Sequence, residues 1–99
     1  MDNKELTWEK VKKDLKLTQE EEAEIQLEMD LIEATIEARK KSNLSQRELS
    51  KISGIKQPAI ARIESRSRSP QASTLIRMLH PMGYTIRVVP LKKENIETL

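Results

Sequence analysis

The sequence predicts an all-α bundle of about five helices, with an extra N-terminal helical segment and one short C-terminal strand. Helix-capping pairs recur along the chain. A glycine separates two short amphipathic segments between residues 44 and 65, the second of which has a proline in its first turn, and residues 84–90 are β-branched and aromatic in character. The 99 residues suit one domain with a modest core, and that core must be aliphatic because only 2% of residues are aromatic.

An apolar stripe on an otherwise charged segment predicts a short helix near the N-terminus. Trp8, Val11 and Leu15 recur at helical spacing, and Thr7 can cap the first turn. This stripe is separate from the pattern expected of the main core.

A longer helix is expected to follow. Thr18 and Glu21 form a capping box, from which the helix runs to about Lys41 and ends at Asn43, a residue that tolerates the left-handed conformation. Residues 25–31 also alternate between apolar and polar, so a strand is the alternative. The caps and the abundance of glutamate favour the helix.

This long helix has apolar residues on two nearly opposite sides. One stripe contains Ile25, Met29, Ile32 and Ile36, and the other contains Leu27, Leu31, Ala34 and Ala38. A helix that is apolar on two sides needs two partners. We expect one side to pack on the bundle, and the other to be covered by residues 1–17, by a second copy or by another protein.

Residues 44–65 predict two short helices joined by a tight turn. Ser45 and Glu48 form a capping box, and Gly54 can end the first helix in a positive-φ conformation. Pro58 fits the first turn of the second helix, whose buried side is expected to contain Ile60 and Ile63. Two helices of this size with a glycine-containing turn make a helix-turn-helix.

The stretch from Leu44 to Glu64 resembles the lambda-repressor-like, Xre-type helix-turn-helix family, in which L-[ST]-Q-x-x-L-[AS]-x-x-x-G-[IV]-x-Q-x-x-I-x-x-[IL]-E recurs. The resemblance implies a DNA-reading second helix and a structural ion pair between Arg39 and Glu64. Two residues depart from the pattern. Lys56 stands where Ser or Thr usually caps the recognition helix, and Thr35 stands where an aliphatic residue is common.

The wider layout is similar to the HigA-like antitoxins of type II toxin–antitoxin systems, through LIEATIEARKKSNLSQ before the motif and GYTIRVVP after it. This resemblance implies repression of the chain's own operon and neutralisation of a RelE/HigB-like mRNA endonuclease toxin. Two alternatives remain: a free-standing Xre-type repressor without a toxin, and a protein-interaction adaptor that does not bind DNA.

The expected partner of the helix-turn-helix is double-stranded operator DNA. Gln57 and Arg62 are expected to read bases in the major groove, and Pro58 and Ala61 to contact thymine methyl groups. Gln46 and Arg47 at the start of the preceding helix, and Arg66 and Arg68 in the loop after the recognition helix, are expected to contact phosphates. The full expected DNA-binding set is Gln46, Arg47, Lys56, Gln57, Pro58, Ala61, Arg62, Arg66 and Arg68.

Charge is divided unevenly along the chain. Residues 1–33 contain five Lys and eleven Asp or Glu, a net charge of −6, whereas residues 34–99 have a net charge of +8. An acidic head suits a basic partner. We therefore predict that residues 1–30 form a partner-binding segment and residues 31–83 the DNA-binding domain. The expected toxin-binding residues are Trp8, Val11, Leu15, Ile25 and Met29.

The end of the chain changes character after a last expected helix, which Pro81 should distort and Gly83 should stop. Residues 84–99 are predicted to contain a dimerisation strand and a tail, with Tyr84, Ile86 and Val88 on one face. A lone strand cannot satisfy its backbone, so it should pair across a two-fold axis in a homodimer or augment a partner's sheet.

Enzymatic and membrane functions find no support in the sequence. It contains no glycine-rich phosphate loop, nucleophile elbow or His–Glu metal spacing, and His80 is its one histidine. We expect neither enzymatic activity nor a metal or cofactor. The N-terminus lacks a signal-peptide pattern and no long apolar run occurs, so we expect a cytoplasmic, nucleoid-associated protein.

Overall fold

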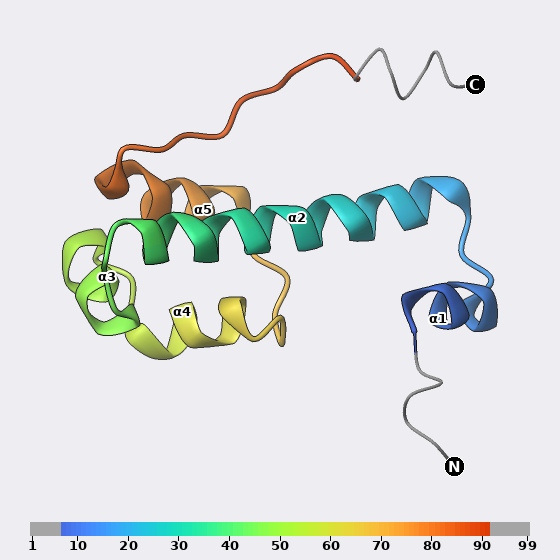
Figure 1. Cartoon of the computed structure of the whole chain (residues 1–99), viewed down its shortest axis with the longest axis horizontal. Coiled ribbons are helices and arrows are strands. Elements are labelled where there is room, and N and C mark those ends of the chain that lie inside the picture. Colours follow the sequence, from blue (N-terminus) through green and yellow to red (C-terminus); the bar gives the residue numbers. More distant parts are fainter. Residues whose placement is uncertain (1–6, 92–99) are drawn as a thin grey trace.

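The structure, a computed structural model, describes residues 7–91. These residues form five α-helices and a short 3-10 helix (Figure 1). In chain order they are α1 Trp8–Leu15, α2 Gln19–Lys41, α3 Gln46–Ser53, α4 Gln57–Glu64, α5 Ala72–Leu79 and the 3-10 helix η2 His80–Met82. The all-helical fold class is confirmed. Across the described range, no helix is long and apolar enough to span a membrane.

The helix ends lie where the capping residues predict them. Thr18 and Ser45 both cap their helices through complete capping boxes, each closed by a glutamate three residues later. Asn43 (φ 58°) and Gly54 (φ 77°) adopt the left-handed conformation that ends α2 and α3. These signals confirm that local chemistry sets the helix boundaries.

The core lies where α2 packs against α4 and α5, and α3 packs against both of those helices. In Figure 1, α4 lies on one side of α2 and the C-terminal segment on the other. Leu49, Ile60, Leu75 and Met78 are almost completely buried. A core of aliphatic residues and methionine therefore joins the helix-turn-helix to its supporting helices.

The buried face of α2 takes residues from both predicted stripes. Its buried residues are Ile32 from one stripe, Ala38 from the other and Thr35 between them, and Leu31 and Ile36 also pack against the core. Thr35 fits this apolar site because its hydroxyl donates to the carbonyl of Leu31 over 2.7 Å. The departure at Thr35 is thus accommodated inside α2 itself.

The N-terminal helix lies apart from the core. In Figure 1, α1 lies below the N-terminal end of α2, and it contributes no described residue to the core cluster. Leu15 is 60% exposed, whereas Val11 of α1 and Ile25 and Met29 of α2 are half-buried. The expected cover for the second side of α2 stays a prediction.

The strand expected over residues 84–90 is not seen in the described single chain. These residues form an irregular segment that begins beside α2, where Ile86 packs against the core. A strand needs a partner for its backbone, and no other segment of residues 7–91 supplies one. The distortion at Pro81 is confirmed, because α5 changes into η2 there and Gly83 (φ 87°) ends it.

Candidate nucleic-acid interface

Helix α4 turns one face to the core and another to solvent. Ile60 and Ile63 are buried, whereas Pro58 and Arg62 are exposed and Ala61 is half-exposed. Lys56 and Gln57 extend the exposed face at the start of the helix. The predicted base-reading residues therefore share one accessible surface, as major-groove reading by a helix requires.

Two serines stabilise the turn that sets the angle between α3 and α4. The Ser50 hydroxyl donates to the carbonyl of Ile55 over 2.6 Å, and the Ser53 hydroxyl accepts from the backbone amide of Ile55 over 3.2 Å. Gly54 lies between Ser53 and Ile55 in its left-handed conformation. The sequence motif identified the glycine, but it did not predict these serine contacts because they depend on how the turn closes.

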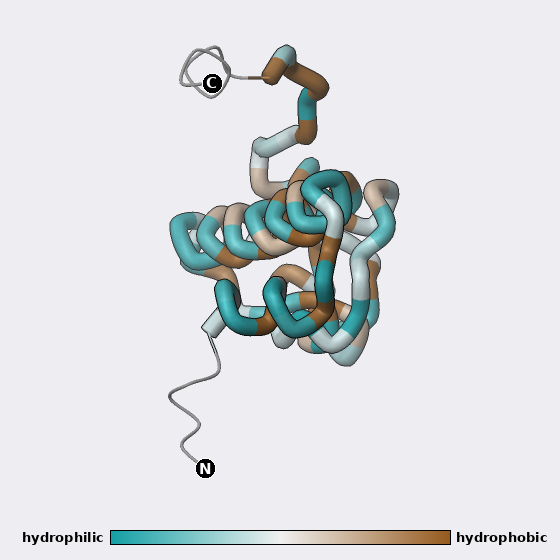
Figure 2. The backbone as a smooth tube through the Cα atoms, turned by 90° about the vertical axis from the view of Figure 1, so that its right-hand side faces the viewer, coloured by the Kyte–Doolittle hydropathy of each residue, from teal (hydrophilic) through white to brown (hydrophobic). Residues whose placement is uncertain are grey.

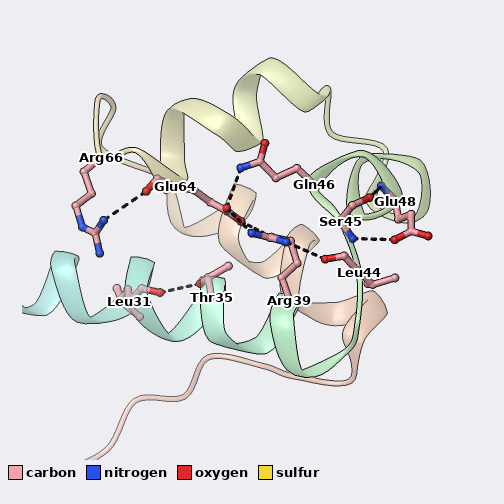
Figure 3. Close-up of polar contacts among 9 residues, drawn as sticks. All are labelled: Leu31, Thr35, Arg39, Leu44, Ser45, Gln46, Glu48, Glu64 and Arg66. Atoms are coloured by element: carbon pink, nitrogen blue, oxygen red, sulfur yellow. Dashed lines mark hydrogen bonds and ion pairs between the residues drawn. The ribbon is translucent and has the colours of Figure 1, made fainter.

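An ion pair fixes the end of α4 to the rest of the fold (Figure 3). Arg39 donates from Nε to Glu64 Oε2 over 2.7 Å and from Nη2 to Glu64 Oε1 over 2.9 Å. Its Nη1 also donates to the carbonyl of Leu44 over 2.8 Å. The two parallel hydrogen bonds match the planar guanidinium to the carboxylate. Together with the bond to Leu44 they hold three elements in one arrangement: α2, the loop that precedes α3, and α4.

The surroundings of this pair shift both pKa values towards the charged forms. The hydrogen bond to Glu64 raises the pKa of Arg39 above its usual value, although burial opposes this change. Burial alone would raise the pKa of Glu64, but hydrogen bonds from Arg39 and Gln46 outweigh it, so the pKa of Glu64 is lowered. The pair is therefore ionised around neutral pH.

Gln46 takes part in the same network. Its Nε2 donates to Glu64 Oε1 over 2.9 Å, so the side chain that we expected to hold a phosphate is already engaged with the end of α4 (Figure 3). Arg47, its neighbour at the start of α3, is exposed. The structure thus gives Gln46 a positioning contact and leaves Arg47 accessible for phosphate.

Arg66 also lies differently from the expectation. It adopts a left-handed backbone (φ 63°), and its Nη2 contacts both carboxylate oxygens of Glu33 on α2, at 2.9 and 3.1 Å. Its Nη1 donates to the backbone carbonyl of Glu64 (Figure 3). Ser69 of the same loop donates to Glu28. These two contacts tie the basic loop between α4 and α5 to α2. Arg66 is therefore paired with a carboxylate where we expected it to be free for a phosphate.

Arg68 lies in a basic hollow beside the start of α4. The hollow has a volume of about 500 Å³ and its lining includes Lys56, Arg68 and Arg77. Arg77 comes from α5, and its guanidinium lies near Gly54. The sequence could not place Arg77 here, because only the packing of α5 brings it beside the turn.

The residues expected to bind partner proteins are dispersed over the other surfaces. The side chain of Trp8 lies outside the described part of the structure, and Val11 is half-buried on α1. Tyr84 and Val88 are exposed on the C-terminal segment. The expected toxin-binding residues lie on α1 and α2 and the expected dimerisation residues on the C-terminal segment, and both assignments stay predictions.

Comparison with known proteins identifies the class to which this interface belongs. Residues 36–89 match the helix-turn-helix family model. The chain is 43% identical over 77 residues to a Haemophilus influenzae protein described as an uncharacterized HTH-type transcriptional regulator, covering 78% of this chain and 79% of that protein. A solved structure described as a toxin–antitoxin module from Streptococcus pneumoniae superimposes with a TM-score of 0.65 at 37% identity, covering 87% of this chain and 94% of that one.

The chain belongs to the helix-turn-helix family of DNA-binding transcriptional regulators, a class of proteins that are not enzymes. Its motif is of the Xre type and its overall layout is antitoxin-like.

Proposed function

We propose that the chain binds operator DNA sequence-specifically, with α4 in the major groove, and represses its own operon. The main support is the outer face of α4, where Gln57, Pro58, Ala61 and Arg62 lie together beside exposed cations. Gln can pair with adenine and Arg with guanine, and small apolar groups can contact thymine methyls.

An operator titration at fixed salt tests this assignment. Arg62→Ala should weaken operator binding by about 1–3 kcal/mol and relax sequence preference, as expected for a base contact. The matched control, Arg68→Ala, should weaken all sequences alike and reduce the salt dependence by about one phosphate contact. Unchanged operator affinity in Arg62→Ala would contradict the proposal.

We further propose that the chain is an antitoxin that binds a RelE/HigB-like toxin through its acidic N-terminal arm, made of α1 and the first half of α2. Leu15 is 60% exposed there, Ile25 and Met29 are half-buried outside the core cluster, and the first turn of α2 contains Glu20, Glu21 and Glu22. Charge of this sign favours association with a basic partner, and apolar anchors supply affinity. The toxin–antitoxin module of similar fold adds support.

Co-expression with the neighbouring gene, followed by pull-down and a translation assay, tests the antitoxin proposal. We expect the neighbouring gene to encode a basic RelE-like protein that the chain binds in the pull-down and inhibits in the translation assay. Operator binding without any captured toxin would instead favour the free-standing repressor. Loss of both would favour an adaptor that does not bind DNA.

A homodimer is also part of the proposal, because a two-fold operator needs two half-site readers about one helical turn apart. Residues 84–91 support the homodimer, because Val88, Val89 and Leu91 are largely exposed in the single chain. Light scattering of the full chain at micromolar concentration tests the homodimer. A chain that is monomeric in this measurement and still binds its operator as a monomer would contradict it.

A further inference from the structure

An uncovered apolar strip runs along the side of α2 where α5 and the C-terminal segment lie (Figure 1). We define this α2 strip as Leu27, Leu31 and Ala34. Leu27 is 60% exposed and Ala34 is also exposed. Leu31, between them, is half-buried and packs against the core. Neighbouring apolar residues at a surface mark interaction sites more often than isolated ones do.

The C-terminal segment crosses the α2 strip at one point and leaves a hollow on each side. One hollow, of about 380 Å³, is lined in part by Leu31, Ala34, Tyr84 and Ile86. The other, of about 240 Å³, lies between Leu27, Leu31, Leu75 and Ile86. Leu31 and Ile86 line both, so the two hollows form one groove interrupted by the side chain of Ile86.

Beyond Ile86 the segment leaves the surface while remaining apolar. Val88 is fully exposed, and Val89 and Leu91 are 70% and 80% exposed. Figure 2 shows hydrophobic residues in this segment as it stands away from the helical body. Within the described chain, no backbone amide of residues 85–91 donates to a backbone carbonyl. The segment therefore has apolar side chains and backbone donors that its own chain does not use.

The charges of the smaller hollow and of the segment are complementary. Glu24 and Glu28 line the smaller hollow, whereas Glu37, Lys41 and Arg87 line the larger one. In the sequence, the apolar residues 88–91 are flanked by Arg87 on one side and by Lys92 and Lys93 on the other. A basic-flanked apolar segment suits an apolar groove with an acidic edge.

We propose that the α2 strip is the docking surface for residues 88–91 of a second copy of this chain. This inference rests on the proposed homodimer and specifies its contacts. Each copy would provide one groove and one segment, which is the reciprocity that a two-fold interface requires. The groove is lined by α2 and the C-terminal segment. That segment lies across α2 from α4 (Figure 1), so docking there leaves both recognition helices accessible.

Full-length variants at exposed positions test this surface by light scattering. Leu27→Asp and Val88→Asp should each shift the chain from dimer to monomer at micromolar concentration, because each places a charge in the docked interface. Leu15→Asp, at an equally exposed leucine on α1, is the matched control and should stay dimeric. Thermal melts followed by circular dichroism should show that all three variants remain helical.

The outcomes separate this inference from the proposed homodimer. A wild-type chain that is monomeric would overturn both the proposed homodimer and the docking surface. A wild-type dimer that persists in Leu27→Asp would overturn the docking surface and leave the homodimer standing.

Cross-linking identifies the occupant of the groove. The chain contains no cysteine, so Leu27→Cys and Val88→Cys can be made singly, tagged to different sizes, mixed and treated with a short bismaleimide. A mixed-size product is expected, and its absence would overturn the proposal. In the Leu27→Cys/Val88→Cys double variant, a link formed only within one chain would mean that the segment folds back on its own groove. Shielding of Leu27→Cys only when toxin is added would assign the groove to the toxin.

Discussion

At the scale of single residues, Glu64 determines how the recognition helix is held. Its carboxylate accepts hydrogen bonds from Arg39 on α2 and from Gln46 on α3, while Glu64 itself ends α4. Both members of the ion pair are largely withdrawn from solvent, with side chains only 12% and 7% exposed. Removing one member would leave the other charge buried without compensation.

We expect Glu64→Gln to destabilise the fold by about 3 kcal/mol at neutral pH, the low end for breaking a buried pair. The pKa of Glu64 is lowered in the folded state, so its stabilising contribution is present at neutral pH. That contribution is lost as pH falls below the usual glutamate pKa of about 4.3 and through the lower folded value. Urea unfolding at several pH values should therefore show the variant and wild type converging in acid.

The exposed Glu37 provides the control for this measurement. Glu37→Gln should unfold like the wild type at neutral pH. A difference between Glu64→Gln and wild type that did not narrow in acid would show that the carboxylate charge is not the stabilising feature.

At the scale of elements, α4 begins less favourably than α2 and α3. Lys56 occupies its N-cap position in extended conformation (φ −64°, ψ 140°) and makes no side-chain capping hydrogen bond within the described structure. Lys56 also lines the basic hollow beside Arg68 and Arg77. Lys56 therefore provides a positive charge beside the recognition helix but no side-chain cap for α4.

We expect Lys56→Ser to stabilise the fold by about 1 kcal/mol, because serine can cap α4 where lysine does not. Operator binding should weaken in the same variant, since a cation is removed. Denaturant unfolding and an operator titration measure the two effects. Lys56→Ala is the control, because it removes the charge without adding a cap. It should weaken operator binding and should not show the increase in stability expected of Lys56→Ser. Equal stabilities of the two variants would contradict the explanation.

The loop between α4 and α5 is held by α2 as well as by the end of α4, where the hydroxyls of Ser65 and Ser67 donate to the carbonyl of Arg62. Glu33 pairs with Arg66, and Glu28 accepts from Ser69, across 33 and 41 residues of chain. The Glu33–Arg66 pair is exposed, so it contributes little to stability. The pair should instead affect DNA binding, because the guanidinium of Arg66 does not contact a phosphate while it is paired with Glu33.

We expect Glu33→Gln to strengthen binding to all DNA sequences alike, with the salt dependence steeper by about one phosphate contact. Freed from its carboxylate, Arg66 can reach the DNA backbone. Titrations against operator and random DNA at several salt concentrations would measure this. Glu37→Gln removes the same charge from the same helix without touching Arg66, so an equal gain in that variant would reduce the effect to net charge alone.

At the scale of the whole molecule, the acidic arm stands apart from the helix-turn-helix body. Helix α1 contributes no residue to the core cluster, and α2 extends past the other helices to reach it (Figure 1). This arrangement fits a chain in which one end meets a protein partner and the other meets DNA. The division into residues 1–30, 31–83 and 84–99 remains our proposal.

Deletion of residues 1–17 should reduce toxin binding while the cooperative melt and operator binding survive. The reason is that the described part of the removed segment lies outside the core. Pull-down with the co-expressed toxin, a thermal melt and an operator titration measure the three properties. A truncated protein that loses its melt but still neutralises toxin in a translation assay would show that the arm is structural.

The sequence by itself determined the features that depend on neighbouring residues. The capping boxes at Thr18 and Ser45, and the left-handed residues Asn43 and Gly54, follow from contacts a few residues apart, so their positions could be predicted. The same holds for the buried Ile60 and Ile63 and the exposed Arg62, because helical periodicity separates the two faces of α4.

Only the tertiary structure decided features that depend on distant segments. The side of α2 that is buried, the capture of Arg66 by Glu33 and the placement of Arg77 beside Gly54 depend on packing between elements. Residues 84–90 have strand-forming side chains, but a strand exists only where a second backbone completes its hydrogen bonds. Sequence periodicity describes what a segment can bury, whereas packing decides which neighbour it meets.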